Sequence, residues 1–155
     1  MRHKLRTKLA LLTPANCGLL LEATLHLLAA RLALHLLPFH WLTWWFQRMV
    51  RSPELGGAAR QLAIQRVCLA LYFANRRLSI NAVCFPLSMA AQTMLRRRGV
   101  STTLYYGAAT LSDHGQLTAH VWLQDGDKGI VAHENISQFQ ILARYSPLQS
   151  ASTRK

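Results

Sequence analysis

The character of the chain changes at Gly99, and this change constrains the fold more than any other feature. Before Gly99 apolar residues recur at helical spacing, whereas after it β-branched and aromatic residues form short runs between turn residues. Helices followed by strands are typical of an α+β domain, and 155 residues are enough for one. We therefore predict an α+β fold in which N-terminal helices pack on a small antiparallel sheet.

Three helices are expected before Gly99. The first covers the apolar residues 19–37, and the second runs from 53 to about 77 after the start signal Ser52-Pro53-Glu54. The third covers about 83–98, after a cap within residues 79–81. The core face of the second helix is predicted from its i, i+3, i+4 spacing to be Ile64, Val67, Cys68, Leu71 and Tyr72.

Three strands are expected after Gly99. They cover residues 102–106, 117–124 and 130 to about 132. The glycine- and aspartate-rich residues 125–129 predict a hairpin turn between the last two strands. We divide the chain into a helical segment at 1–50, a domain at 51–148 and a disordered tail at 149–155.

Residues 19–37 are long enough to span a bilayer, but their polar residues argue against it. On a helical wheel Glu22 and His26 share one side, and Arg31 and His35 lie opposite. An arginine at a bilayer centre costs about 3 kcal/mol on insertion scales. We predict a helix that packs against protein on both flanks, with at most peripheral membrane contact through Trp41, Trp44 and Trp45.

The composition points to a reduced, cytoplasmic protein. Three cysteines without a CxxC pair favour neither a disulfide framework nor a metal site, and no cleaved signal is expected. Eighteen basic and six acidic residues give a net charge of +12, but the bases are dispersed and match no nucleic-acid motif. We expect no metal, no cofactor and no nucleic-acid partner.

Cys84 and His120 are the candidate catalytic pair. Cys84 begins the third predicted helix, where exposed N–H groups and the positive end of the dipole favour a thiolate. His120 lies 36 residues later, in the middle of the second strand. A cysteine on a helix start and a histidine on a following strand form the arrangement of thiol hydrolases. Cys17 and Cys68 are interpreted as inert.

The third member of a triad depends on the hairpin register. A turn about Gly126 and Asp127 places His133 opposite His120, whereas a turn centred on Asp127 places Glu134 there. Glu134 is our prediction for the acid that orients His120. Asp113 and Asn135 stay open as alternatives, and Asp125 and Asp127 are expected to be solvated at the hairpin tip.

Four segments resemble one enzyme family in order and spacing. They are CFPLSMAAQTMLRRRGV from Cys84, LYYG from Leu104 with AHVWL from Ala119, IVAHE from Ile130, and ARYSPL from Ala143. Together they are similar to the B-type leader peptidases of lasso-peptide biosynthesis, in their stand-alone protease form. This chain departs from the family pattern at Leu87, at Gln124 and in the altered acidic strand Ala132-His133-Glu134.

The resemblance implies a fold, an activity and partners. The fold is transglutaminase-like, with a papain-like core, and the activity is that of a cysteine protease with a Cys84–His120–acid triad. The substrate is a ribosomally made precursor peptide. Its leader is held by a small partner protein, and an asparagine-synthetase-like cyclase then closes the macrolactam. The alternatives are another thiol acyl-transfer enzyme, such as a transglutaminase or amidase, and a non-catalytic membrane-associated scaffold.

Overall fold

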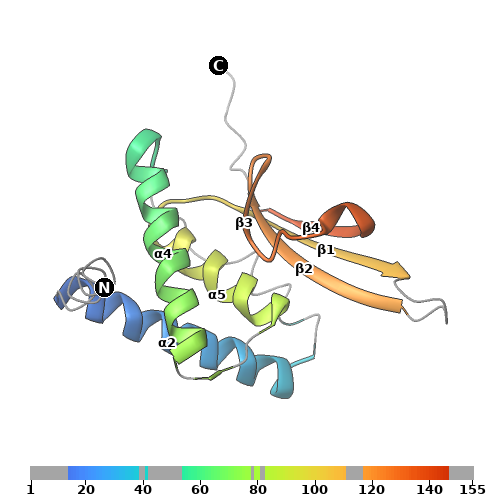
Figure 1. Ribbon diagram of the computed structural model, residues 1–155, viewed down its shortest axis with the longest axis horizontal. Coiled ribbons are helices and arrows are strands. Elements are labelled where there is room, and N and C mark those ends of the chain that lie inside the picture. Colours follow the sequence, from blue (N-terminus) through green and yellow to red (C-terminus); the bar gives the residue numbers. More distant parts are fainter. Residues whose placement is uncertain are drawn as a thin grey trace, which may run out of the picture.

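The computed structural model describes residues 14–38, 41, 54–77, 79–80, 83–110 and 117–146. The predictions made for Trp44, Trp45, Ser52, Pro53, Asn81, Asp113 and the tail lie outside these residues. The elements are α2 (Pro14–Leu36), α4 (Gly57–Arg77), α5 (Cys84–Arg96), β1 (Thr103–Thr110), β2 (Leu117–Asp125), β3 (Lys128–Val131), the 3₁₀ turn η1 (Ile136–Gln138) and β4 (Gln140–Tyr145). Figure 1 shows the helices gathered on one side of the sheet, so the α+β prediction is confirmed.

The sheet has the order β3-β2-β1-β4, and all its neighbouring strands are antiparallel. Both registers considered for the hairpin occur in it. Next to the turn at Gly126, which has φ +58°, Asp125 pairs with Lys128. A bulge then shifts the pairing by one residue, so that Leu123 faces Val131. Because β3 ends at Val131, neither register continues as far as His120.

The main core lies between the helices and one face of the sheet. Side chains on successive residues of a strand point to opposite faces, and here alternate residues of β2 enter the core. Val121 and Leu123 pack there with Leu104 of β1. The helices contribute Ala23, Leu27, Val67, Leu71, Ala91, Met94 and Leu95 to the same buried cluster. His120 and Trp122 therefore belong to the other face of β2.

The second helix begins later than predicted. Residues 54–56 are not helical, and α4 starts at Gly57, where φ is +54°. The preceding segment is held elsewhere: the Leu55 N–H donates to the Gly99 carbonyl at 2.7 Å, and Ser101 Oγ donates to Glu54 at 2.8 Å. These two bonds tie residues 54–55 to the segment before β1, and the left-handed glycine lets the chain turn into the helix.

Three further predictions are corrected. The N-cap of α5 is Val83, whose side chain makes no capping hydrogen bond. The predicted cap within residues 79–81 is therefore wrong for Ser79, which the structure describes. Tyr72 is 55% exposed rather than part of the core, and its hydroxyl accepts a hydrogen bond from Arg76. Strand β4 was not predicted, and β1 reaches Thr110 instead of ending at 106.

Helix α2 has two apolar faces separated by polar seams. One face, with Ala23, Leu27 and Ala30, is buried. At the seams, Glu22 pairs with Arg98, and Arg31 donates to the Ile80 carbonyl. The opposite face is exposed and carries Leu21, Leu25, Leu28, Leu32 and Leu36. We predicted that protein would cover both sides of this helix. In the described chain that prediction is wrong, because the leucine side is exposed.

The Glu22–Arg98 pair should give the fold a measurable dependence on pH. The two side chains approach to 2.5 Å, and the hydrogen bond from Arg98 lowers the pKa of Glu22 despite its partial burial. A lowered folded-state pKa stabilises the fold above the unfolded value near about 4.3, and this contribution is lost as the pH falls through the folded value. Glu22→Gln should therefore lower the free energy of unfolding by about 1 kcal/mol at pH 7, and by less below about pH 4.

Urea unfolding of both proteins at pH 7 and pH 3.5 measures this difference. Asp127→Asn is the matched control, because Asp127 is exposed at the hairpin tip and should change the stability little at either pH. A Glu22→Gln deficit of the same size at both values would show that the lost contact is not the ion pair.

Candidate active site

Cys84 is the first residue of α5, as predicted, and it is half-buried. The Leu87 N–H donates to the Val83 carbonyl at 3.2 Å and closes the first turn. Ser88, one turn after Cys84 on the same side of the helix, donates its hydroxyl to the Val121 carbonyl at 3.3 Å. Val121 is the neighbour of His120, so α5 packs beside the part of β2 that carries His120 (Figure 1), while the His120 side chain belongs to the other face of that strand. Among the described contacts, none joins the Cys84 thiol to the His120 ring.

His120 is held through a backbone carbonyl. Its Nε2 lies 2.7 Å from the carbonyl oxygen of Ala132. A carbonyl only accepts hydrogen bonds, so Nε2 must carry the proton. In the neutral ring Nδ1 then keeps its lone pair and is the nitrogen that can take a proton from a thiol.

The conformation of Ala132 directs this carbonyl. Ala132 follows the last residue of β3 and has φ 53°, in the left-handed region that favours glycine over alanine. Asn135 repeats the left-handed conformation at φ 56° and leads into η1. The loop from 132 to 139 thus leaves the sheet, and Phe139 at its end stacks on His120 with ring centroids 4.9 Å apart.

A row of rings, made by Tyr105, Trp122 and Phe139, packs around His120, and Trp122 also contacts Phe139 with ring centroids 6.4 Å apart. Trp122 lies 5.9 Å from His120, and Tyr105 stacks on Trp122 at 5.5 Å with the rings nearly parallel. Gly107, the β1 partner of His120, makes room for this row. A Cβ at Gly107 would come within 2.9 Å of the Trp122 ring and 3.0 Å of the Gln140 carbonyl oxygen. The imidazole is therefore fixed by stacking as well as by its hydrogen bond.

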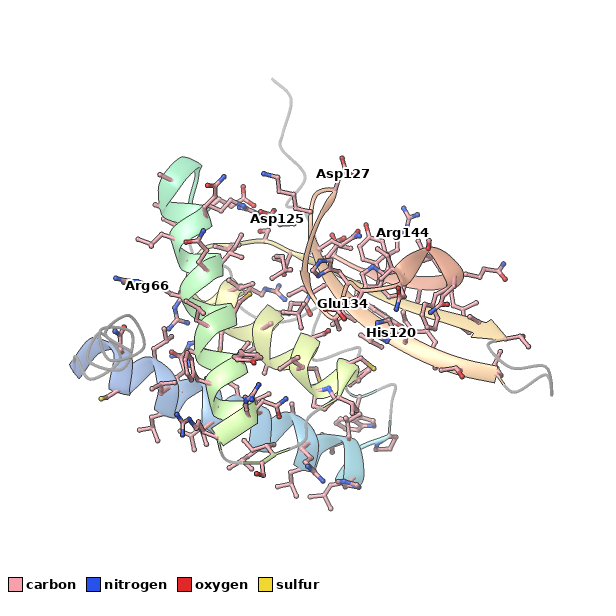
Figure 2. All side chains as sticks on the ribbon, in the orientation of Figure 1. Arg66, His120, Asp125, Asp127, Glu134 and Arg144 are labelled. Atoms are coloured by element: carbon pink, nitrogen blue, oxygen red, sulfur yellow. The ribbon has the colours of Figure 1, made fainter. Side chains whose placement is uncertain are left out.

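The structure does not place a carboxylate on His120 among the described residues. Glu134 is exposed, two residues beyond Ala132, and forms no hydrogen bond with the ring. Figure 2 shows both side chains at the same end of the hairpin, away from Asp127. Asn135 is also exposed. The role of Glu134 as the acid stays a prediction. The hydrogen bond between His120 and Ala132 could not be predicted from the sequence, because every residue has a backbone carbonyl.

Asp125 is not solvated as predicted. Its carboxylate receives two hydrogen bonds from Arg60, at 2.6 and 3.0 Å, and Arg60 also donates to the Ser101 carbonyl. The bond to Asp125 is the main cause that raises the pKa of Arg60 above its ordinary value. This pair fastens the hairpin to α4 and leaves Asp125 with a structural role.

The other cysteines do not compete with Cys84. Cys68 is half-buried, its thiol lies 3.9 Å from the Ile130 carbonyl oxygen, and burial raises its pKa to about 11. It is therefore a protonated thiol at neutral pH and a poor nucleophile. Cys17 is exposed on α2. No group of three or more His, Cys, Asp or Glu residues in the described chain could hold a metal ion.

A model of the Transglutaminase-like superfamily matches residues 33–144. The chain belongs to this superfamily. Its members include cysteine proteases and acyltransferases, so an enzyme that works through a thiol is supported, and the matched residues contain both Cys84 and His120. The transglutaminase-like fold predicted from the sequence is thereby confirmed. Neither the curated proteins nor the solved structures gave a match to the chain.

Proposed function

We propose that this transglutaminase-like protein is a cysteine peptidase that removes the leader from a lasso-peptide precursor. One observation carries the chemical part of the proposal: the Nε2 of His120 is bound to the Ala132 carbonyl, which leaves Nδ1 as a base. The thiol that it would serve is Cys84, at the start of the helix that packs against the same strand. The family motifs around both residues support the choice of substrate.

In the proposed mechanism Cys84 is the nucleophile and His120 is the base. Nδ1 of His120 takes the thiol proton, and the sulfur of Cys84 attacks the carbonyl carbon of the scissile peptide bond. Backbone N–H groups at the start of α5 stabilise the oxyanion. The tetrahedral intermediate collapses when His120 gives its proton to the leaving amine, which leaves a thioester on Cys84. Water, deprotonated by His120, then attacks the thioester and releases the leader as a carboxylate.

The proposed product explains the partners that we expect. Cleavage frees the amine at the start of the core peptide, and an asparagine-synthetase-like cyclase joins that amine to a side-chain carboxylate in the macrolactam. A separate small protein holds the leader and delivers the precursor. Genes beside the one for this chain should therefore encode a short precursor, a leader-binding protein and a cyclase.

Mass spectrometry of the precursor tests the proposal. Incubation with this chain and the leader-binding partner should yield a free leader and a core peptide whose masses add up to that of the precursor plus one water. A leader that is instead joined to an added amine would favour the acyltransferase alternative. An intact precursor under all conditions, with a folded protein, would favour the scaffold alternative and refute the proposal.

We further propose a cytoplasmic protein that attaches peripherally to the membrane. Residues Asn16–Leu36 are long and apolar enough to cross a bilayer, with a mean hydropathy of 1.5, and only 17% of this apolar stretch is buried. The pairing of Glu22 with Arg98 favours a helix that stays on the protein, and its exposed leucines and Trp41 supply the apolar contact.

Fractionation of expressing cells distinguishes attachment from spanning. Concentrated salt or alkaline carbonate should release the protein from membranes, because peripheral attachment combines partial insertion with charge attraction. Extraction by detergent alone would make α2 a transmembrane helix.

A further inference from the structure

Strand β3 is an edge strand of the sheet, on the side of α4 (Figure 1). Two hollows are lined by residues of both elements, one after the other along α4. The larger hollow, of about 450 Å³, lies beside the first two turns of α4, and Ile64 is one of the residues that line it. The smaller, of about 260 Å³, begins one turn later at Cys68. Ile130 lines both hollows, so they lie next to each other, and we call the two together the α4–β3 groove.

Two residues on the wall of the smaller hollow link it to the proposed catalytic pair, although neither Cys84 nor His120 lines it. Leu87, on its wall, lies in the first turn of α5, three residues after Cys84. Ala132, also on its wall, supplies the carbonyl that holds His120. We therefore expect a group in this hollow to lie within a few residues of the bond that Cys84 attacks.

The walls of the smaller hollow are mainly apolar. Leu71, Leu87 and Val131 contribute hydrocarbon. The Cys68 thiol adds no charge at neutral pH, because burial raises its pKa to about 11. The charged Glu134 is exposed, at the rim. Such a site favours an uncharged, apolar side chain over a lysine or a glutamate.

The larger hollow and the edge strand suit an extended chain. Gln61, Gln65 and Lys128 line the larger hollow with polar groups, while Arg60 and Asp125 are already paired with each other. Strand β3 has a partner on one side only in the described sheet, and the backbone of an edge strand can pair with an added peptide.

We propose that the α4–β3 groove binds the substrate peptide in an extended conformation alongside β3. The smaller hollow takes an apolar side chain within two residues of the scissile bond, on its N-terminal side. This inference rests on the proposed peptidase function and names the residues that select its substrate: Leu71, Leu87 and Val131, with Tyr72 at the rim.

Acetylated dipeptide chloromethyl ketones test the groove without the natural substrate. A cysteine nucleophile displaces chloride from these reagents and forms a carbon–sulfur bond, which peptide mapping assigns to Cys84 or Cys17. Reagents with Leu, Lys or Glu at either position, and Gly at the other, should label Cys84 at different rates. We expect the best leucine reagent to react at least about tenfold faster than its lysine and glutamate counterparts.

Leu87→Trp should fill the smaller hollow. Iodoacetamide has no peptide side chain to bind in the hollow, so its rate of reaction with Cys84 corrects for any change in the thiol itself. We expect Leu87→Trp to lower the ratio of the leucine-reagent rate to the iodoacetamide rate at least about tenfold. Leu69→Trp is the matched control, because Leu69 is 56% exposed on α4 and outside the groove. If circular dichroism shows that Leu87→Trp does not fold, Tyr72→Ala decides instead: by opening the rim it should reduce the preference for leucine at least about threefold.

The outcomes separate the groove from the function. If no peptide reagent labels Cys84 faster than Cys17, the peptidase function itself fails. The groove proposal fails, while the peptidase function stands, if Cys84 is labelled selectively but at the same rate by the leucine, lysine and glutamate reagents. It also fails if the folded variant, Leu87→Trp or Tyr72→Ala, shows no change in this labelling.

Discussion

Cys84→Ala should abolish leader release and leave the fold intact. The variant removes the sulfur that forms the thioester, and losses of this kind in enzymes with a nucleophile and a base reach about 1,000-fold or more in kcat. Cys84 is half-buried at the start of α5, so an alanine there removes little packing. Mass spectrometry of the precursor measures the loss, and thermal unfolding verifies the fold.

Cys17→Ala is the control for this result. Cys17 lies exposed on α2, and its replacement should leave the rate of cleavage unchanged. Cleavage by Cys84→Ala at more than about a tenth of the wild-type rate would show that another group carries the reaction. An equal loss in both variants would point to a structural effect.

His120→Gln should lower kcat by about 100- to 10,000-fold, the usual contribution of a general acid–base. A glutamine amide can still donate to the Ala132 carbonyl, so the hydrogen bond can be kept while the proton acceptor is lost. The residual rate should rise toward alkaline pH, because hydroxide replaces the missing base. His35→Ala, on the exposed part of α2, should behave like the wild type.

The same assay decides the role of Glu134. If its carboxylate stabilises the imidazolium, Glu134→Gln lowers kcat with little change in KM. If the Ala132 carbonyl and the rings of Trp122 and Phe139 suffice to orient His120, Glu134→Gln retains nearly full kcat. Full activity of His120→Gln would contradict the catalytic role of the histidine in either case.

The fold class could be predicted because the change of pattern at Gly99 is local. Gly99 itself has φ 71° after the last turn of α5, as a glycine stop requires. The start of α4 could not be predicted, because residues 54–55 are bound to residues 99 and 101, far away in the sequence. Strand β4 was missed because QILARY is neither strongly β-branched nor bounded by turn residues on both sides.

The candidate site was predicted in part. Cys84 and His120 lie on the elements that the sequence indicated, since a helix start and a strand centre are local features. The carbonyl of Ala132 could not be found, because its direction depends on a left-handed residue after β3. The Arg60–Asp125 pair joins residues 65 positions apart, so the hairpin sequence alone suggested a solvated aspartate.

Cleavage in water enriched in ¹⁸O tests the central claim most directly. If a thioester on Cys84 is hydrolysed, the new carboxylate of the released leader gains one ¹⁸O atom, the core peptide gains none, and Cys84→Ala gives neither product. A precursor that stays intact with the folded wild-type protein and its partner, or that is cleaved equally by Cys84→Ala, would contradict the claim.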